Sequence, residues 1–169
     1  VEYGALVLFT SREQMRQAVD ALATSMRSVV LVQNQLPRTQ LLARHRERVA
    51  AGEPSIIFGM QSFGEGLDLP GRLCESVFIT KLPFAPPDDP VGETRAEWLR
   101  AVGRDPFSEL VVPATAIRLA QWAGRAIRTE EDQAHVYCYD KRLTRTSYGQ
   151  RLLKGLPPFT LERRGARGQ

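Results

Sequence analysis

The sequence predicts an α/β fold, with a mainly parallel sheet and helices on both faces. Short apolar runs alternate along the chain with longer segments of helical periodicity, as in parallel strands joined by right-handed helical crossovers. The runs at residues 5–9 (ALVLF) and 55–60 (SIIFGM) are typical of strands buried on both faces. With 169 residues, 43% hydrophobic and 25% charged, the chain has the size and composition of one globular domain.

The first strand is predicted at residues 5–9, because Thr10 and Ser11 cannot extend its apolar pattern. Ser11 is a suitable N-cap for a helix over residues 12–24. The inner stripe of that helix consists of Met15, Val19 and Leu22.

A second strand follows at residues 29–32, and a second helix spans residues 39–50 until Gly52 and Pro54 end it. Its apolar residues are expected to face inward and its arginines largely outward. The inward residues are Leu41, Leu42 and Val49, and the outward ones are Arg44, Arg46 and Arg48.

The later part of the chain continues the alternation after a loop stiffened by prolines. Strands are predicted at residues 55–60, 76–80 and 134–139, and helices at residues 91–102, 114–128 and 143–153. In the helix over residues 91–102, the interpretation places Trp98 in the core together with Leu99 and Val102. We divide the chain into a domain of residues 1–158 and a basic tail of residues 159–169.

Charge and cysteine content narrow the class of protein. The net charge is +4 and the pI is about 9.4, which favours a polyanionic partner, although the small excess also fits a merely solvated surface. Neither a membrane span nor a signal-peptide pattern is recognisable, so we expect a cytoplasmic protein with no membrane partner. Cys74 and Cys138 are expected to be buried thiols, and His45 and His135 to have surface or structural roles, with no metal site.

The octet at residues 121–128, QWAGRAIR, carries one candidate site. On a helix, Gln121, Arg125 and Arg128 fall at i, i+4 and i+7, which stacks an amide and two guanidiniums on one face. Two adjacent arginines repel each other unless they share an anion, and a phosphate matches the guanidinium fork. Taken alone, the octet is explained equally well by a solvated basic helix face.

A second candidate site is the segment of residues 61–71, QSFGEGLDLPG. Its glycines and proline force a turn at the carboxyl end of a strand, where open α/β sheets place ligands. Gly64 and Gly66 allow close approach of a ligand to the backbone, Asp68 is a suitable acceptor for a hydroxyl, and Glu65 is a second carboxylate. The alternative is a tight turn in which Asp68 caps a backbone amide.

Together, the two segments resemble the fifth and sixth motifs of superfamily 2 helicases of the DinG/XPD-like branch, nearest to its bacterial DinG-type members. The matching sequences are SFGEGLDLPG at residues 62–71 and QWAGRAIR at residues 121–128. LVLFTS at residues 6–11 is similar to motif IV, and LPFAPPDDP at residues 82–90 to the segment after motif V. The resemblance covers residues 4–158 and implies a RecA-like lobe, the second motor lobe of an ATP-dependent DNA helicase.

The resemblance also implies roles for individual residues. Arg125 and Arg128 would stabilise charge on the γ-phosphoryl group of ATP, and Gln121 would orient the attacking water. Asp68, with Glu65 beside it, would bind the ribose or tether an arginine, and Gly66 would let the backbone approach the nucleotide. Gly124 would be small because two lobes close across it. The alternatives are that Gln121 bridges helices and that Gly124 serves packing alone.

The chain contains no GxxxxGK[ST] phosphate loop and no DEAH-type carboxylate pair. We therefore expect ATP and Mg²⁺ to be bound mainly by the N-terminal motor lobe of the same protein, and this chain alone to hydrolyse no ATP. In many members of the branch the first lobe also carries an iron–sulfur cluster. None is expected here, where the cysteines do not suit one.

The nucleic-acid partner implied by the resemblance is single-stranded DNA, along which a bacterial, nucleoid-associated helicase would move 5′ to 3′ in replication or repair. Thr10 and Ser11 are the expected phosphate contacts, and Lys81, Phe63 and Phe84 are weaker candidates, with Phe63 better explained as core. One alternative is a docking module that binds a replication or repair protein. Another is the motor of a related helicase-nuclease or RNA-directed enzyme.

Overall fold

The fold is a five-stranded parallel sheet in the order β2-β3-β1-β4-β5, so the predicted α/β class is confirmed. The computed structural model describes residues 1–85, 90–127 and 132–164. The strands are β1 (Gly4–Phe9), β2 (Val30–Val32), β3 (Ser55–Met60), β4 (Ser76–Ile79) and β5 (His135–Cys138).

Helices connect the strands, and three short helical turns lie next to these helices and strands. The α-helices are α1 (Arg12–Asp20), α2 (Thr24–Arg27), α3 (Arg38–Ala50), α4 (Gln61–Gly64), α5 (Pro90–Ala101), α6 (Val112–Ala123), α7 (Arg142–Arg145) and α8 (Ser147–Lys154). The turns are η1 (Gly71–Cys74), η2 (Phe107–Val111) and η3 (Gly124–Ala126). None of the described helices is long and apolar enough to span a membrane.

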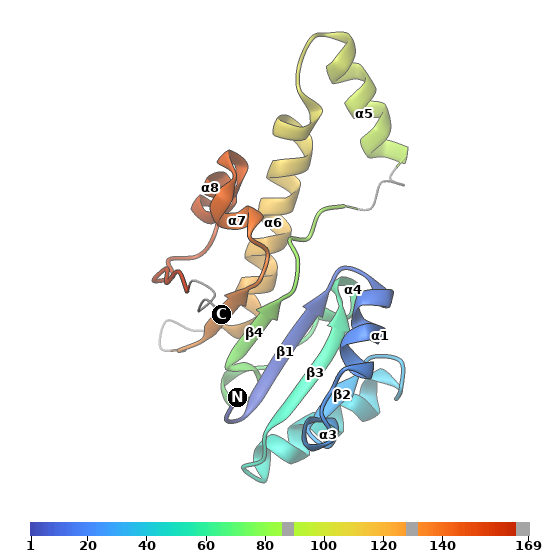
Figure 1. The fold of residues 1–169 in the computed structure, drawn as a ribbon, viewed down its shortest axis with the longest axis vertical. Coiled ribbons are helices and arrows are strands. Elements are labelled where there is room, and N and C mark those ends of the chain that lie inside the picture. The colour runs from blue at the N-terminus through green and yellow to red at the C-terminus, as the bar shows by residue number, and fades with distance from the viewer. Residues whose placement is uncertain (86–89, 128–131, 165–169) are drawn as a thin grey trace.

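Two apolar clusters cover the two faces of the sheet. On one face, Met15 of α1 packs with residues of β1, β2 and β3 such as Phe9 and Phe58. On the other face, Leu41 of α3 and Leu119 of α6 pack with residues of the same sheet. Figure 1 shows α6 running alongside β4 and β5, whereas α5 stands away from the sheet. Because every paired strand runs parallel to its neighbour, the carboxyl ends of all five strands lie along one edge of the sheet.

At the amino edge of the sheet, the start of β1 packs closely against η1, and a buried histidine of α3 is hydrogen-bonded to η1 and β3. A Cβ at Gly4 would lie 2.6 Å from the carbonyl oxygen of Arg72 and closer still to that of Leu73. The fully buried His45 donates its Nε2–H to the Leu73 carbonyl over 2.7 Å, and its Nδ1 accepts from the Ser55 hydroxyl over 2.8 Å. His45 therefore has a structural role, which is one of the two roles expected for it, and not a surface role.

The pKa of His45 is lowered. Burial is the main cause, and the positive charges of Arg46 and Arg48 act in the same direction, against the hydrogen bond to Leu73. Burial therefore favours the neutral ring, which can make both hydrogen bonds.

Three predicted helices have different bounds in the structure. The helix expected over residues 12–24 ends at Asp20, and α2 is a separate turn. The helix expected over residues 143–153 is divided by Thr146, whose side chain caps α8. The helix expected over residues 114–128 ends at Ala123, because the chain tightens into η3 from Gly124 onward.

The predicted core position of Trp98 is wrong, because its side chain is 59% exposed. Leu99 is buried, but Val102 is also exposed, since α5 has no broad contact with the sheet. Cys74 is buried as expected, whereas Cys138 is only half-buried. Among the described residues, no group of three metal-ligating side chains lies together.

Candidate nucleotide and nucleic-acid site

The two candidate segments, distant in sequence, lie side by side in the structure. Leu67 and Leu69, from the loop after α4, are buried in the same apolar cluster as Trp122 and Ala126. The turn η1, which follows this loop, also contacts η3. The acidic loop of residues 65–68 and the octet that carries the arginines are therefore anchored in the same apolar cluster.

The octet itself is not one helix. Gln121 is exposed on the last turn of α6, Arg125 lies in η3, and Ile127 has extended backbone with φ −119° and ψ 123°. The predicted i, i+4, i+7 stack is therefore wrong, since the helical path ends before the position of the second arginine. Arg128 lies outside the described residues.

Arg125 has an unusual environment for a guanidinium group. The side chain is half-buried, and its Nε is buried with no hydrogen-bond partner among the described residues. A buried N–H without an acceptor costs about 1–3 kcal/mol, so such groups in native proteins are commonly satisfied by a ligand, water or another domain. This donor is the feature of the site that most directly fits an anion.

The glycines of the two segments differ in what they require. Gly66 has φ +70°, a left-handed conformation that favours glycine, and no described atom lies within 4 Å of an added Cβ. Gly124 has an ordinary helical conformation and equally open space. Packing within the described chain therefore does not explain Gly124. Gly64 is buried, with an added Cβ 3.1 Å from the Leu8 side chain, so it serves packing and is not open to a ligand as predicted.

The carboxylates Asp68 and Glu65 are both exposed on the loop after α4. Arg38 donates to the backbone carbonyl of Glu65 over 3.0 Å, and its guanidinium lies 4.9 Å from the centre of the Phe63 ring. Arg38 thus ties α3 to this loop. The sequence analysis missed Arg38, because nothing in its local pattern signals a contact 27 residues away.

Arg38 also borders a small polar hollow of about 250 Å³ at the carboxyl ends of β2 and β3. Gln33, beside it, accepts a hydrogen bond from the Met60 N–H over 2.7 Å. These groups stabilise the start of the loop. The hollow is lined by Gln33, Asn34, Leu36, Arg38, Ser62 and Phe63.

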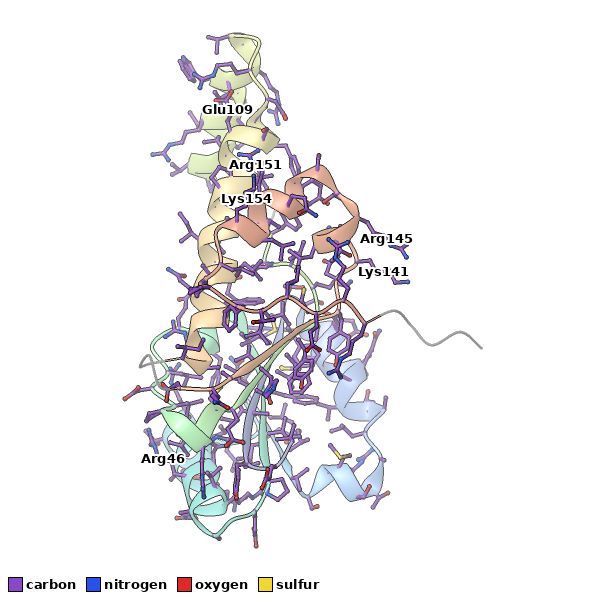
Figure 2. The ribbon with its side chains drawn as sticks, turned by 90° about the vertical axis from the view of Figure 1, so that its left-hand side faces the viewer. Arg46, Glu109, Lys141, Arg145, Arg151 and Lys154 are labelled. Atoms are coloured by element: carbon purple, nitrogen blue, oxygen red, sulfur yellow. The ribbon has the colours of Figure 1, made fainter. Side chains whose placement is uncertain are left out.

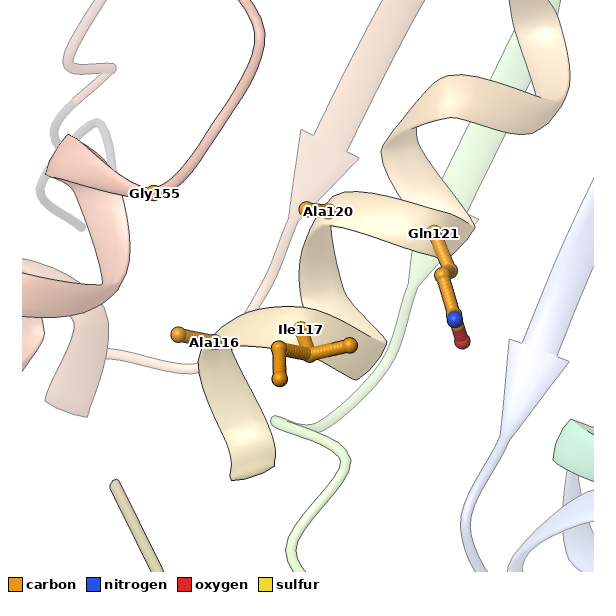
Figure 3. A pocket seen from close by; sticks show the side chains of 5 residues that line it. All are labelled: Ala116, Ile117, Ala120, Gln121 and Gly155. Carbon is orange, nitrogen blue, oxygen red and sulfur yellow. The ribbon is translucent and has the colours of Figure 1, made fainter. Parts of the chain in front are cut away.

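Gln121 borders a second, shallow hollow of about 430 Å³ between α6 and the end of α8. Figure 3 shows its side chain pointing away from Gly155, which lines the opposite side. The other lining residues are Ala116, Ile117 and Ala120, so no charged side chain borders this hollow. It offers nothing to bind a phosphate, and we do not place the nucleotide there.

The predicted nucleic-acid residues fall into two groups. Thr10, Ser11 and Lys81 lie at the carboxyl ends of the neighbouring strands β1 and β4, with Thr10 half-buried and the other two exposed. Ser11 accepts from the Gln14 N–H over 3.4 Å as the N-cap of α1, which leaves its hydroxyl hydrogen available to a phosphate oxygen.

The two phenylalanines belong to the second group. Phe63 is only 5% exposed, so it is a core residue and not a base platform. Phe84 is half-buried and packs against Phe107 and Tyr148, with the Arg142 guanidinium 4.9 Å from its ring centre. Both rings pack against other side chains of this chain, so neither offers a free surface for stacking bases.

Comparisons with known proteins show the family of this chain. The family model described as "Helicase C-terminal domain" matches residues 1–159. The protein named ATP-dependent DNA helicase DinG of Escherichia coli (strain K12) is 45% identical over 159 residues, covering 94% of this chain and 22% of that protein. Its namesake in Photobacterium profundum is 42% identical over 161 residues, covering 94% of this chain and 23% of that protein.

Solved structures show the same fold at lower identity. The structure titled "XPD_Helicase" has a TM-score of 0.66 at 23% identity, covering 91% of this chain and 27% of that one. The "Structure of S. tokodaii Xpd4" has a TM-score of 0.60 at 22% identity, covering 93% of this chain and 29% of that one. The chain spans about a fifth of the length of the DinG proteins it matches. With nearly every residue matched by the family model, the chain belongs to the helicase C-terminal domain family.

Proposed function

We propose that this chain is the second motor lobe of an ATP-dependent DNA helicase and that Arg125 reaches a nucleotide bound mainly by the first lobe. The observation that carries the proposal is the Nε of Arg125, which is buried without a hydrogen-bond partner among the described residues. Its neighbour Ala126 shares an apolar cluster with Leu67 and Leu69 of the loop after α4. The family, and the similarity to proteins named ATP-dependent DNA helicase DinG, support it. Arg125 fits a phosphate because its guanidinium keeps its charge and donates in a plane.

The neighbouring residues suit a site completed by another domain. Gly66 and Gly124 leave open space at the backbone, and Asp68 and Glu65 are exposed for a ribose hydroxyl. Gln121 is exposed near the end of α6, where it is available to orient water. Bound ATP would bring Mg²⁺ to the first lobe, and an iron–sulfur cluster, where the parent protein has one, would also lie there.

Arg128 is proposed as the second arginine of this site, on the resemblance alone. An arginine finger contributes roughly 10³–10⁵ in rate by stabilising charge on the transferring phosphoryl group. Closure of the two lobes on ATP and reopening after hydrolysis would advance a single strand held at Thr10, Ser11 and Lys81. The proposed direction is 5′ to 3′, and the proposed setting is DNA replication or repair.

The test uses the two-lobe protein, in which this chain is joined to the first lobe of its parent. We expect Arg125→Ala to lower ATP turnover in the presence of single-stranded DNA at least 10³-fold, with the melting temperature unchanged. The matched control is Arg44→Ala, an exposed arginine on α3. Wild-type turnover by the Arg125→Ala variant would overturn the proposed role, and ATP hydrolysis by this chain alone would contradict the need for a first lobe.

A second candidate function is docking of a replication or repair protein. It is favoured by α5, which stands away from the sheet and exposes Val91 and Trp98, at i and i+7 of the helix, with the exposed Val102 directly after its end. Binding of a purified replication or repair protein that is lost on Trp98→Ala would support docking. Binding that is unchanged by this substitution would contradict a role for α5.

A further inference from the structure

The carboxyl end of β5 carries cations that the proposed nucleotide site does not use. We propose that Lys141 and Arg145, with Tyr139 beside them, form a second binding station for the phosphates of the single strand, next to the contact already proposed at Lys81. The proposal rests on the proposed function, which places the strand at Thr10, Ser11 and Lys81, and it extends that path from Lys81 to the end of β5.

The pairing of β4 with β5 brings these residues together. Ile79 is in register with Cys138, and the Tyr139 N–H donates to the Ile79 carbonyl over 3.0 Å. Just beyond the strands, the Leu82 N–H donates to the Asp140 carboxylate over 3.0 Å. Lys81 and Lys141, the neighbours of these two residues in sequence, therefore lie at the same end of the paired strands.

The only carboxylate in residues 139–145 is already occupied. Asp140 has a side chain only 7% exposed and accepts from Arg142 Nη2 over 2.6 Å and Nε over 3.0 Å. Burial alone would raise the pKa of Asp140, but the hydrogen bonds from Arg142 and from the Leu82 N–H outweigh it and lower that pKa to about 2. Asp140 is therefore ionised at neutral pH and compensates Arg142.

No carboxylate among the described residues pairs with the other three cations. Lys81, Lys141 and Arg145 are exposed, and none of them has an ion-pair or side-chain hydrogen-bond partner among the described residues. Some other exposed arginines of the chain pair with carboxylates. Examples are Arg16, Arg100 and Arg104. Three uncompensated charges at one edge favour a polyanion, because its phosphates release counterions when they are neutralised.

Two of the cations project in a common direction. Lys141 is the N-cap residue of α7 and Arg145 its last residue, four positions apart, which is the spacing of neighbours on a helix face. Figure 2 shows both side chains extending to the same side, and Arg46 of α3 near the far end of the molecule. Arg151, by contrast, donates to the hydroxyl and carbonyl oxygens of Ser108 and is not part of the station.

Tyr139 supplies an aromatic surface next to these charges. It is 65% exposed and stacks on Phe78, with ring centres 6.5 Å apart and planes 8° from parallel. Cationic side chains along a strand's backbone, combined with an exposed aromatic ring, are the pattern by which proteins hold single-stranded nucleic acid without reading its sequence. Phe84, the aromatic expected for this purpose, is instead packed within the chain.

The station lies within reach of the proposed phosphate contacts on β1. In the order β1-β4-β5, two strand spacings of about 4.8 Å separate the ends of β1 and β5, or about 10 Å. About three stacked nucleotides at roughly 3.4 Å each cover that distance. One strand therefore has the length to contact Ser11 and Lys141 at once, running across the carboxyl edge of the sheet.

The experiment measures binding of the complete 169-residue chain to a fluorescein-labelled dT oligonucleotide of about 15 residues, by anisotropy over a range of NaCl concentrations. The double variant Lys141→Gln/Arg145→Gln removes two contacts, so we expect the slope of log K against log [NaCl] to become shallower by about 1.4. At 0.1 M salt, affinity should fall by roughly 10- to 30-fold. We also expect Tyr139→Ala to lower affinity at least fivefold with the slope unchanged, and Tyr139→Phe to bind like wild type.

The matched control is Arg44→Gln/Arg46→Gln, which makes the same change in net charge on exposed residues of α3. It should leave the slope close to that of wild type. Equal slopes for the two double variants would overturn the station, because the effect would then reflect total charge alone. A wild-type chain that does not bind the oligonucleotide would instead overturn the proposed nucleic-acid path itself, which separates the two failures.

Discussion

Replacement of Gly124 by alanine separates folding from function at the candidate site. Gly124 has φ −70° and ψ −9°, a conformation open to any L-residue, and no described atom lies within 4 Å of an added Cβ. Alanine here reduces the freedom of the unfolded chain without strain in the folded one. We therefore expect Gly124→Ala to stabilise the chain by about 0.4–1 kcal/mol.

In a chain of this size, that free energy corresponds to a rise in melting temperature of roughly 1–4 °C. In the proposed two-lobe site, the same methyl group would stand next to Arg125, in the space over which the first lobe would close. We expect ATP turnover of the two-lobe protein to fall for this reason, by about tenfold or more, since small misplacements in a closed site are costly. Stability and activity thus change in opposite directions.

The assays are thermal unfolding of this chain by circular dichroism and ATP turnover of the two-lobe protein. The control is Gly52→Ala, at φ +77° in equally open space after α3, which should lose about 1 kcal/mol of stability and keep full turnover. A lower melting temperature for Gly124→Ala would show that packing within this chain requires the glycine. Unchanged turnover would refute closure of a lobe over it.

Three further outcomes test the fold. Gly4→Ala should cost about 2–4 kcal/mol in urea unfolding, because its Cβ would meet the Leu73 carbonyl and disturb the His45 hydrogen bond to it; a cost below about 0.5 kcal/mol would contradict this. Asp140→Asn should cost about 1–2 kcal/mol at pH 7, after allowance for solvent screening. That difference should shrink as the pH falls from about 4 to 2, through the folded-state pKa of about 2, and a pH-independent difference would refute the ion pair with Arg142. Burial lowers the pKa of His45, so the unfolded state takes up its proton first, and wild-type stability should decline below about pH 6.5 more steeply than that of His45→Gln.

The strands and the cap of α1 were predictable because their signals are local. Residues 55–60 were predicted with the observed bounds of β3, since a continuous apolar run ends there at a glycine-rich turn. Ser11 caps α1 as expected, because capping involves only residues three positions apart. The family was likewise predictable, since it depends on motifs that are read directly from residue types.

Trp98 shows the limit of local patterns, whereas the core position favoured for Phe63 is confirmed. Helical periodicity places Trp98 on one stripe with Val102, but it does not tell whether another element covers that stripe, and in the structure none of the described elements does so broadly. Phe63 is buried because β1 and α4 pack together across the sheet, as the close approach of Gly64 to Leu8 indicates. The charge of a side chain is known from the sequence. Whether an opposite charge pairs with it depends on which residues the fold brings close.

The sequence by itself determined the α/β class, the order of the elements and the family, because periodicity, turn residues and motifs act over a few neighbouring positions. Only the tertiary structure decided that Arg125 has a buried donor without a described partner, that His45 fastens η1 to α3 and β3, and that Asp140 compensates Arg142 while Lys141 and Arg145 remain free among the described residues. The physical reason is that burial and pairing are set by contacts between segments far apart in the chain, which no local pattern encodes.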